Sequence, residues 1–244
     1  MNELKKQLTN LKLSGMVKTS ESRNKQALDK KMSYIEFLSL LLEDEFLNRQ
    51  NNSFKKRFYK SKLNISKTIE TYDFTFQPEL DKRLLMELAS CRFIQEKKNI
   101  IFMGNPGVGK THLANAIALE ALKQGYKVLM THSSDLVEKL FSSKGDGSYF
   151  TTLKTFLDVD LLVIDELGFK KIAEKSIDEF FEVIRKRYEF GSIIITTNRN
   201  FEEWGNVFGD AVLASAIIDR IIHHSHVIRI TGNSYRIKNI NSPE

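Results

Sequence analysis

The stretch GNPGVGKT, from Gly104 to Thr111, limits most strongly what this chain can fold into. It satisfies the pattern G-x-x-x-x-G-K-[ST] and lies between an apolar run of strand length, NIIFM, and an amphipathic helical run, THLANAIALEALKQG. Glycines in this position let backbone N–H groups curl around a phosphate at the start of a helix. A chance glycine-rich turn would not require both flanking elements, so the stretch predicts a phosphate-binding loop in an α/β protein.

The sequence around this loop alternates between strand and helix patterns. Short β-rich apolar runs occur at Asn99–Met103, Lys127–Thr131, Asp160–Asp165, Ser192–Thr196 and His226–Ile230. Helical patterns occur at Lys110–Gln124, Ser133–Phe141, Ser176–Phe190 and Asp210–His223. Short apolar strands separated by helices are typical of parallel sheets that are covered on both faces. We therefore expect a five-stranded, mainly parallel sheet with helices on either side.

The first quarter of the chain has helical patterns without strands. Ile35, Leu38, Leu41, Leu42 and Phe46 form one apolar stripe; Ser33 is placed as the N-cap of their helix and Glu36 as its capping-box partner. Helical periodicity is lost from Thr68 to Pro78, where TYDFTFQP looks extended. We therefore expect a small all-helical domain over residues 1–67 and an α/β domain over residues 68–244.

The positive charge of the chain is concentrated in the helical domain. Residues 1–67 hold 15 Lys and Arg against 7 Asp and Glu, a net +8, whereas the remaining residues hold 22 against 24, a net −2. Lys55, Lys56 and Arg57 interleave with Phe54 and Phe58, a mixture that suits a nucleic-acid backbone. A basic domain of this kind fits a nucleic acid or an acidic protein. Two structural alternatives stay open: a solvated helical surface, and side chains that cover a domain junction.

Composition excludes several other classes of protein. Apolar residues make up 41% of the chain and charged residues 28%, which fits a folded globular chain rather than a disordered one. The longest apolar runs have strand length, well short of the ~20 residues of a membrane helix, so we expect a cytoplasmic protein without a membrane partner. Cys91 is the single cysteine, and its apolar helical surroundings predict a buried free thiol.

A second motif, LLVIDE, supplies the groups that nucleotide hydrolysis needs beside the phosphate loop. In the loop, Lys110 is placed to reach the β- and γ-phosphates of ATP, and the Thr111 hydroxyl to bind Mg²⁺. Asp165 ends an apolar strand and can hold Mg²⁺ through its water shell, and Glu166 beside it can act as general base on the attacking water. The order of these motifs along the chain predicts an ATPase.

Three further polar residues are candidates for the same site. Asn198 follows the strand SIIITT, where an amide can contact the γ-phosphate or the lytic water. Arg220 lies in an amphipathic helix and Arg236 beyond the last strand; a phosphate-loop ATPase needs an arginine near the γ-phosphate, and a neighbouring subunit can supply it. Asp219 and Arg220 can equally form a plain surface pair, and the sequence does not decide between these roles.

Together, GNPGVGKTHLANAIALEA, THSSDLVEKL, LLVIDELGF and the segment IIITTNRNFEEWGNVFGDAVLASAIIDRIIHHSHVIRITGNSYR resemble the IstB-like transposition helper ATPases of bacterial insertion sequences. These are AAA+ proteins related to the DnaC helicase loaders and the DnaA initiators. The resemblance spans roughly Leu80–Arg236, and WGNVFGD with its downstream segment is more specific than the phosphate loop. It implies a P-loop AAA+ three-layer sandwich in which the strand before Asn198 lies between the other two motif strands.

The resemblance also assigns roles to single residues. It makes Lys110 and Thr111 the Walker A pair, Asp165 and Glu166 the Walker B pair, Asn198 the first sensor, and Arg220 an arginine finger across a subunit interface. Nucleotide contacts are implied for Gly104, Asn105, Pro106, Gly107, Val108, Gly109, Lys110, Thr111, His112 and Arg236. A helical insertion over Ser133–Lys154 is implied to face DNA, with Lys139, Lys144 and Lys154 as phosphate contacts and GDG as a flexible link.

The function implied by the resemblance is ATP-dependent action on DNA. ATP-loaded subunits are expected to form a homo-oligomer on duplex DNA, deform it and recruit a transposase. Sequence preference should be low, because lysine–phosphate contacts carry no sequence information. The alternative is a DnaC-like helicase loader that grips another protein. A small-molecule kinase fits poorly, because Glu166 and Asn198 suit water activation.

Overall fold

The computed structural model describes residues 2–169, 172 and 176–235, and the chain divides into two compact units, Met1–Arg57 and Phe58–Glu244. The division concerns packing, and the expected functional boundary at residues 67/68 stays a prediction.

The first unit is helical, as the sequence predicts. It contains α1 (Asn2–Asn10), α2 (Ser14–Asp29) and most of α3 (Tyr34–Ser61). The capping box of α3 is confirmed: the Glu36 N–H donates to Ser33 Oγ at 3.3 Å, and Glu36 Oε2 accepts from the Ser33 N–H at 2.7 Å. Within the unit, Arg23 donates two 2.8 Å bonds to the Asp44 carboxylate on α3, which joins α2 to α3.

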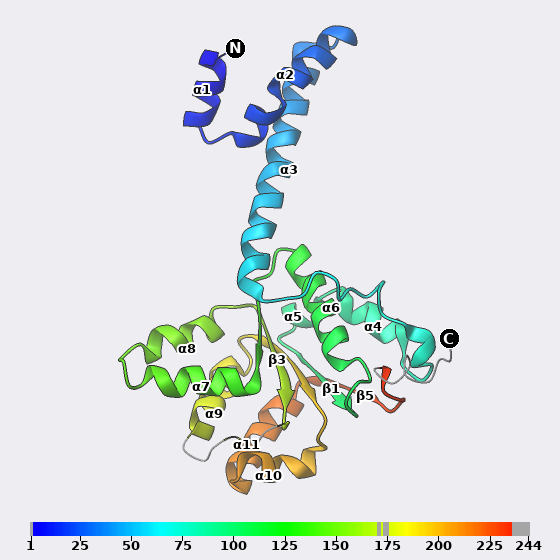
Figure 1. Cartoon of the computed structure of the whole chain (residues 1–244), viewed down its shortest axis with the longest axis vertical. Coiled ribbons are helices and arrows are strands. Elements are labelled where there is room, and N and C mark those ends of the chain that lie inside the picture. Colours follow the sequence, from blue (N-terminus) through cyan, green and yellow to red (C-terminus); the bar gives the residue numbers. More distant parts are fainter. Residues whose placement is uncertain (1, 170–171, 173–175, 236–244) are drawn as a thin grey trace, which may run out of the picture. The chain divides into compact units, whose positions relative to one another are not determined.

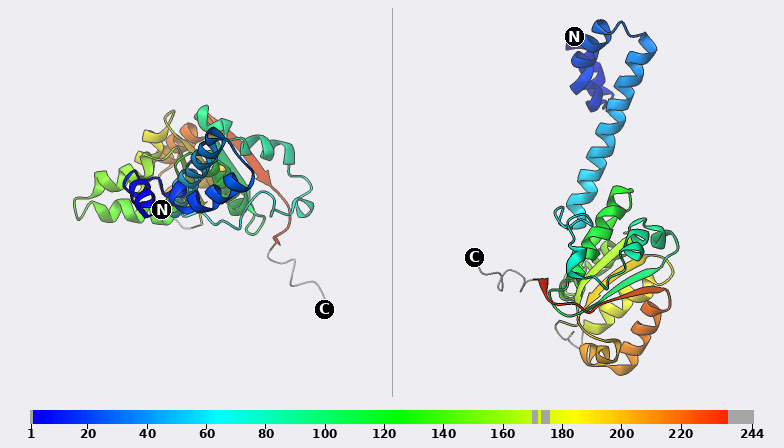
Figure 2. Two further views of the ribbon diagram at one scale, coloured as in Figure 1. Left: turned by 90° about the horizontal axis from the view of Figure 1, so that it is seen from above. Right: turned by 90° about the vertical axis from the view of Figure 1, so that its right-hand side faces the viewer.

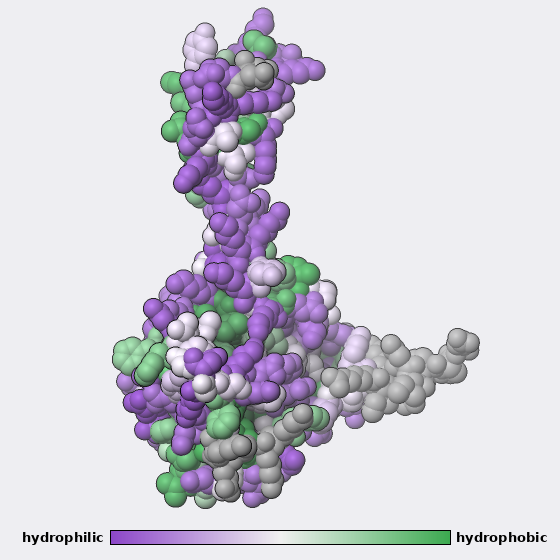
Figure 3. All heavy atoms as spheres, turned by 60° about the vertical axis from the view of Figure 1, so that its left-hand side comes forward, coloured by the Kyte–Doolittle hydropathy of each residue, from purple (hydrophilic) through white to green (hydrophobic). Residues whose placement is uncertain are grey.

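The predicted apolar stripe of α3 lies mostly on the surface. Leu41 is buried, whereas Ile35, Leu38, Leu42 and Phe46 are each more than half exposed. Apolar patches of this unit are visible among its hydrophilic side chains in Figure 3. The stripe therefore marks a helix correctly, but packing within the unit covers little of it.

The second unit is built on a five-stranded sheet with the order β2-β3-β4-β1-β5, in which every neighbouring pair is parallel. The strands are β1 (Asn99–Gly104), β2 (Val128–His132), β3 (Leu161–Leu167), β4 (Ser192–Thr197) and β5 (Ser225–Ile230). All five expected strands are confirmed within two residues at each end. The strand before Asn198 does lie between the two other motif strands.

Helices cover both faces of this sheet, which confirms the three-layer sandwich. On one face lie α4 (Lys82–Ala89), α5 (Arg92–Gln95) and α6 (Lys110–Lys123). On the other face lie α7 (Ser133–Ser143), α8 (Tyr149–Leu157), α9 (Ile177–Arg187), α10 (Trp204–Phe208) and α11 (Ala211–Ile222). The short 3₁₀ helices η1 (Phe74–Phe76) and η3 (Phe201–Glu203) connect elements. The layers can be followed in Figures 1 and 2.

The buried guanidinium of Arg187 joins the beginnings of two strands. It donates hydrogen bonds to five backbone carbonyls, those of Phe156, Leu157, Val159, Asp160 and Ser192. Burial lowers the pKa of Arg187 to about 10, still high enough to keep the charge at neutral pH. Because β3 carries the Asp165–Glu166 pair near its end and β4 precedes Asn198, these bonds help to hold both strands in register.

Two expectations from composition concern this unit and the whole chain. Cys91 is fully buried as a free thiol, and burial raises its pKa to about 12, so the predicted buried thiol is confirmed. Across the described ranges of the chain, no helix combines the length and apolar character that a membrane span requires.

Candidate nucleotide-binding site

The phosphate loop connects β1 to α6 in a strand–loop–helix unit. Gly107 and Gly109 adopt φ angles of 82° and 98°, which favour glycine. A Cβ on Gly107 would lie 2.0 Å from Ser234 Oγ, so the close approach of the C-terminal segment also requires a glycine here. Lys110 Nζ donates to the carbonyls of Gly104 and Asn105, at 2.8 Å each.

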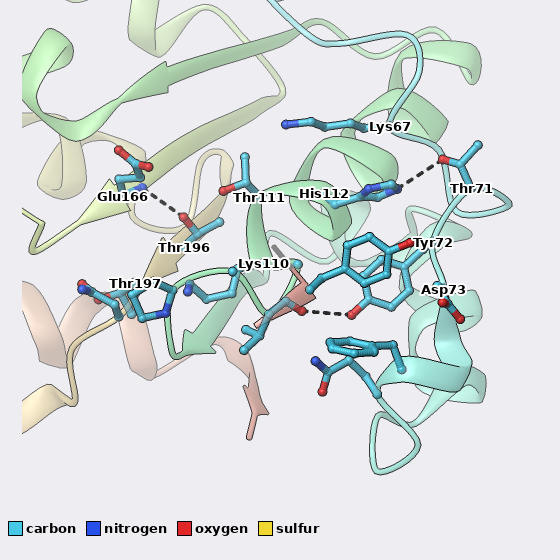
Figure 4. Close-up of a pocket in the computed structure, with 18 of the residues that line it drawn as sticks. Lys67, Thr71, Tyr72, Asp73, Lys110, Thr111, His112, Glu166, Thr196 and Thr197 are labelled. Atoms are coloured by element: carbon cyan, nitrogen blue, oxygen red, sulfur yellow. Dashed lines mark hydrogen bonds between the residues drawn. The ribbon is translucent and has the colours of Figure 1, made fainter. Parts of the chain in front are cut away.

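A cavity of about 480 Å³ opens over this loop (Figure 4). Most of the candidate nucleotide contacts line it, together with the candidate catalytic residues Glu166 and Asn198: Pro106, Gly107, Val108, Gly109, Lys110, Thr111 and His112. Gly104 and Asn105 instead contact the Lys110 ammonium through their carbonyls. Residues from three strand ends and the start of α6 thus meet around one space of ligand size.

Asp165 is buried at the floor of the site, and its Oδ1 accepts two hydroxyl hydrogen bonds. Thr111 Oγ donates at 2.9 Å and Thr196 Oγ at 2.5 Å. A carboxylate and a hydroxyl at a phosphate loop fit Mg²⁺, a hard cation that uses few protein oxygens and completes its shell with phosphate and water. Sequence reasoning missed Thr196, because threonine is common in strands and gave no separate signal.

Glu166 faces the cavity although it directly follows the buried Asp165. Its φ angle is 58°, in the left-handed region, and the pairing of β3 with β4 shifts register between Ile164 and Leu167. Left-handed backbone costs a non-glycine residue on the order of 1 kcal/mol. The Glu166 N–H donates to Thr196 Oγ at 3.0 Å, and Glu166 Oε2 lies 3.7 Å from Nδ1 of His132. This local turn exposes the Glu166 carboxylate while its neighbour stays buried.

The wall opposite β3 comes from a segment that the sequence did not assign to the site. Lys67, Thr71, Tyr72, Asp73, Phe76, Gln77 and the more distant Tyr235 line the cavity. Tyr72 OH donates to the Val108 carbonyl at 3.2 Å, and its ring meets the His112 ring edge-on at 5.4 Å. Burial raises the pKa of Tyr72 to about 12. The aromatic residues of TYDFTF are the available signal in the sequence, but the loss of helical periodicity there indicates only a domain boundary.

The structure describes one of the two candidate arginines, Arg220. Arg220 lies on α11, where its Nη1 donates to the Ala216 carbonyl at 2.9 Å and its guanidinium lies 5.2 Å from the Phe181 ring centre. Among the described residues that line the cavity, Arg220 does not occur. Arg236 lies outside the described residues.

The candidate DNA contacts in the second unit lie on the helical pair α7–α8, which follows β2 where an insertion was expected. Lys139 and Lys154 are exposed. Lys144 forms an ion pair with the buried carboxylate of Glu179, and this hydrogen bond raises the pKa of Lys144. This ion pair attaches the turn that follows α7 to helix α9, so Lys144 already has a structural role.

The remaining candidates lie on α3. Lys55 and Lys56 are exposed, and Arg57 Nη1 donates to Ser53 Oγ at 2.6 Å. A contact of any of these lysines or this arginine with DNA stays a prediction.

The fold and the cavity define an ATP-binding protein of the P-loop AAA+ class. The chain is similar to the AMPPCP-bound DnaA of Aquifex aeolicus, with 25% identity and a TM-score of 0.59 over 74% of this chain and 55% of that one. It is also similar to DnaI, with 25% identity and a TM-score of 0.57 over 67% and 90% of the two chains. The DnaC helicase loader gives 28% identity and a TM-score of 0.52 over 61% and 88%.

More specifically, the chain belongs to the family of IstB-like ATP binding proteins, which matches residues 6–242. It is 44% identical to an ATP-binding protein of insertion sequence IS5376 from Geobacillus stearothermophilus, over 85% of this chain and 82% of that protein. It is 38% identical to the corresponding protein of IS21 from Pseudomonas aeruginosa, over 98% and 90% of the two chains. The resemblance seen in the sequence is thereby confirmed.

Proposed function

We propose that this protein hydrolyses ATP to control its assembly on duplex DNA, where it remodels the DNA and recruits the transposase of an insertion sequence. One observation carries the proposal: Lys110, Thr111, Glu166 and Asn198 line one cavity, and Asp165 is hydrogen-bonded to Thr111 at its floor. Membership of an insertion-sequence ATP-binding family supplies the biological setting.

The chemistry follows from the positions of these side chains. When ATP binds, the Lys110 ammonium gives up its hydrogen bonds to two loop carbonyls and contacts the β- and γ-phosphates instead. The start of α6 adds backbone N–H groups as further phosphate donors. Glu166 accepts the proton of the attacking water, which Asn198 orients from the end of β4. Thr111 and Asp165 would hold Mg²⁺, which neutralises charge on the phosphate oxygens.

Arg220 completes the site of a neighbouring subunit in this proposal. Arg220 is partly exposed on α11 and does not line the cavity of its own chain among the described residues, which supports action in trans. An arginine shared in this way links ATP occupancy to the formation of a homo-oligomer. The exposed apolar side chains of α3 support an assembling protein as well, because monomeric chains rarely leave such stripes uncovered.

Duplex DNA is the proposed substrate of the assembly. Lys139 and Lys154 on the α7–α8 pair, with Lys55, Lys56 and Arg57 on α3, would contact phosphates, so sequence preference is low. Lys144 contributes to DNA binding indirectly, because its ion pair with Glu179 stabilises the α7–α8 pair. The transposase supplies the cutting and joining chemistry.

Fluorescence anisotropy of a labelled duplex tests this proposal. With ATP or a non-hydrolysable analogue we expect binding whose affinity falls with salt at a log–log slope of about −0.9 per phosphate neutralised, and we expect weaker binding with ADP. Absence of duplex binding at low salt with ATP and with the analogue would remove the proposal.

A helicase loader is the second candidate, favoured by the similarity to DnaI and the DnaC helicase loader. A loader should prefer single-stranded over double-stranded DNA and should bind a replicative helicase. Competition between the two DNA forms separates the candidates directly. A transposase reading frame immediately upstream of the coding sequence would favour the transposition function independently.

A further inference from the structure

Residues 64–72, here called the strap, run along the phosphate loop and α6. Asn115 on α6 is fully buried, and both polar atoms of its amide side chain form hydrogen bonds with the strap. Its Nδ2 donates to the carbonyls of Asn64 at 2.8 Å and Lys67 at 2.9 Å. Its Oδ1 accepts from the Asn64 N–H at 2.8 Å. A buried amide with every donor and acceptor used specifies one arrangement of its partners. The backbone of Lys67 is therefore fixed to the helix that follows the phosphate loop.

The rest of the strap is anchored to the same face. His112 Nε2 donates to the Thr68 carbonyl at 2.7 Å, and Tyr72 OH donates to Val108. Val108, His112 and Asn115 are spaced four and three residues apart, so they present one row of contacts along the loop and α6. The strap follows this row and forms a wall of the cavity through Lys67, Thr71 and Tyr72.

The side chain of Lys67 enters the cavity from this wall. Figure 4 shows it extending from the strap toward the side on which Thr111 and Glu166 lie, away from Tyr72. None of the ion pairs formed within the described part of the chain involves its ammonium group. A cation is thus held over the end of the site where the terminal phosphate of ATP is expected.

We propose that Lys67 is a phosphate-binding residue that contacts the γ-phosphate of ATP in cis and lets the site distinguish ATP from ADP. The inference rests on the proposed placement of ATP on the loop. The triphosphate carries more charge than Lys110 alone neutralises, and a second ammonium can form a charge-assisted hydrogen bond with it; because the backbone of Lys67 is already fixed, only its side chain has to be ordered. Because the strap is the covalent continuation of α3, such a contact would make the connection to the first unit sensitive to the nucleotide.

Titrations with fluorescent ADP and with a fluorescent non-hydrolysable ATP analogue test this role in the full chain. Lys67→Ala should lose about tenfold in affinity for the analogue and less than about twofold for ADP, and Lys67→Arg should retain most of the analogue affinity. Lys62→Ala is the matched control, because it removes the same charge five residues upstream and Lys62 does not line the cavity. Equal losses for both nucleotides, or no loss, would overturn the proposal.

A double-mutant cycle tests the positioning role of Asn115. If Asn115 acts through Lys67, Asn115→Ala should reduce the preference for the ATP analogue over ADP in the wild-type chain, and it should cause no further reduction in a chain that already carries Lys67→Ala. Additive effects would show that the strap does not position Lys67. The titrations measure binding alone, so a wild-type chain that binds ATP without hydrolysing it would contradict the proposed function and leave this inference standing.

Discussion

Replacing Asn115 by alanine should destabilise the second unit, because the side chain joins the strap to α6 through three hydrogen bonds. Each such bond contributes about 1 kcal/mol net. Because the strap lies at the surface, water can replace part of the lost hydrogen bonding. The free energy of unfolding should therefore fall by about 3 kcal/mol for the three bonds together, less than the full cost of leaving three buried polar groups without partners. For a unit of this size, that corresponds to roughly 6–12 °C in melting temperature.

Trp204 makes the measurement specific to this unit. It is the single tryptophan of the chain and is fully buried beside Phe201 and Phe208, so its fluorescence reports unfolding of the second unit. Urea denaturation followed at Trp204 should show a lower midpoint for Asn115→Ala with an unchanged slope. Lys123→Ala, an exposed change on the same helix, should alter stability by less than about 1 kcal/mol. A loss below about 1 kcal/mol for Asn115→Ala would refute the reasoning.

Four further variants probe other parts of the molecule. Lys110→Ala should abolish ATP-dependent assembly in size-exclusion chromatography, and normal ATP binding by this variant would contradict its assigned role. Glu166→Gln should bind ATP but lose about 10²–10⁴ in turnover and prolong the DNA complex; undiminished phosphate release would count against a general base. Arg220→Ala should bind ATP normally yet lose cooperative hydrolysis, and mixing with Lys110→Ala chains should restore part of it, whereas no recovery would speak against action in trans. The hydrogen bonds from Arg23 lower the pKa of Asp44 from 3.8 to about 2. This pair therefore stabilises the first unit above about pH 4, and its contribution is lost as the pH falls toward 2. Asp44→Asn should flatten that part of the acid unfolding curve in circular dichroism, and an unchanged curve would exclude the pair as the cause.

The features that the sequence predicted well are those encoded by local pattern. The phosphate loop, the five strands and the placement of Asp165 and Glu166 at the end of a buried strand each follow from residue spacing over a few positions. The position of β4 between β3 and β1 was available only through the family resemblance, because strand order depends on contacts between distant segments.

The residues that the sequence did not reveal act across long separations. Asn115 lies in a helical run and contacts a segment about fifty residues upstream, and Thr196 looks like an ordinary strand residue until Asp165 lies beside it. Arg187 carried no separate signal in the sequence, and in the structure it is buried among carbonyls. Conversely, the apolar stripe of α3 predicted the helix correctly although most of the stripe is exposed, because periodicity identifies a helix but not what covers it.

Electron microscopy of the chain with ATP and duplex DNA tests the central claim, that ATP controls assembly on DNA, most directly. The account predicts particles with several copies around one duplex, with Arg220 of each copy directed at the nucleotide cavity of its neighbour, and loss of these particles when ADP replaces ATP. Single copies on the DNA in the presence of ATP, or the same oligomers with either nucleotide, would contradict it.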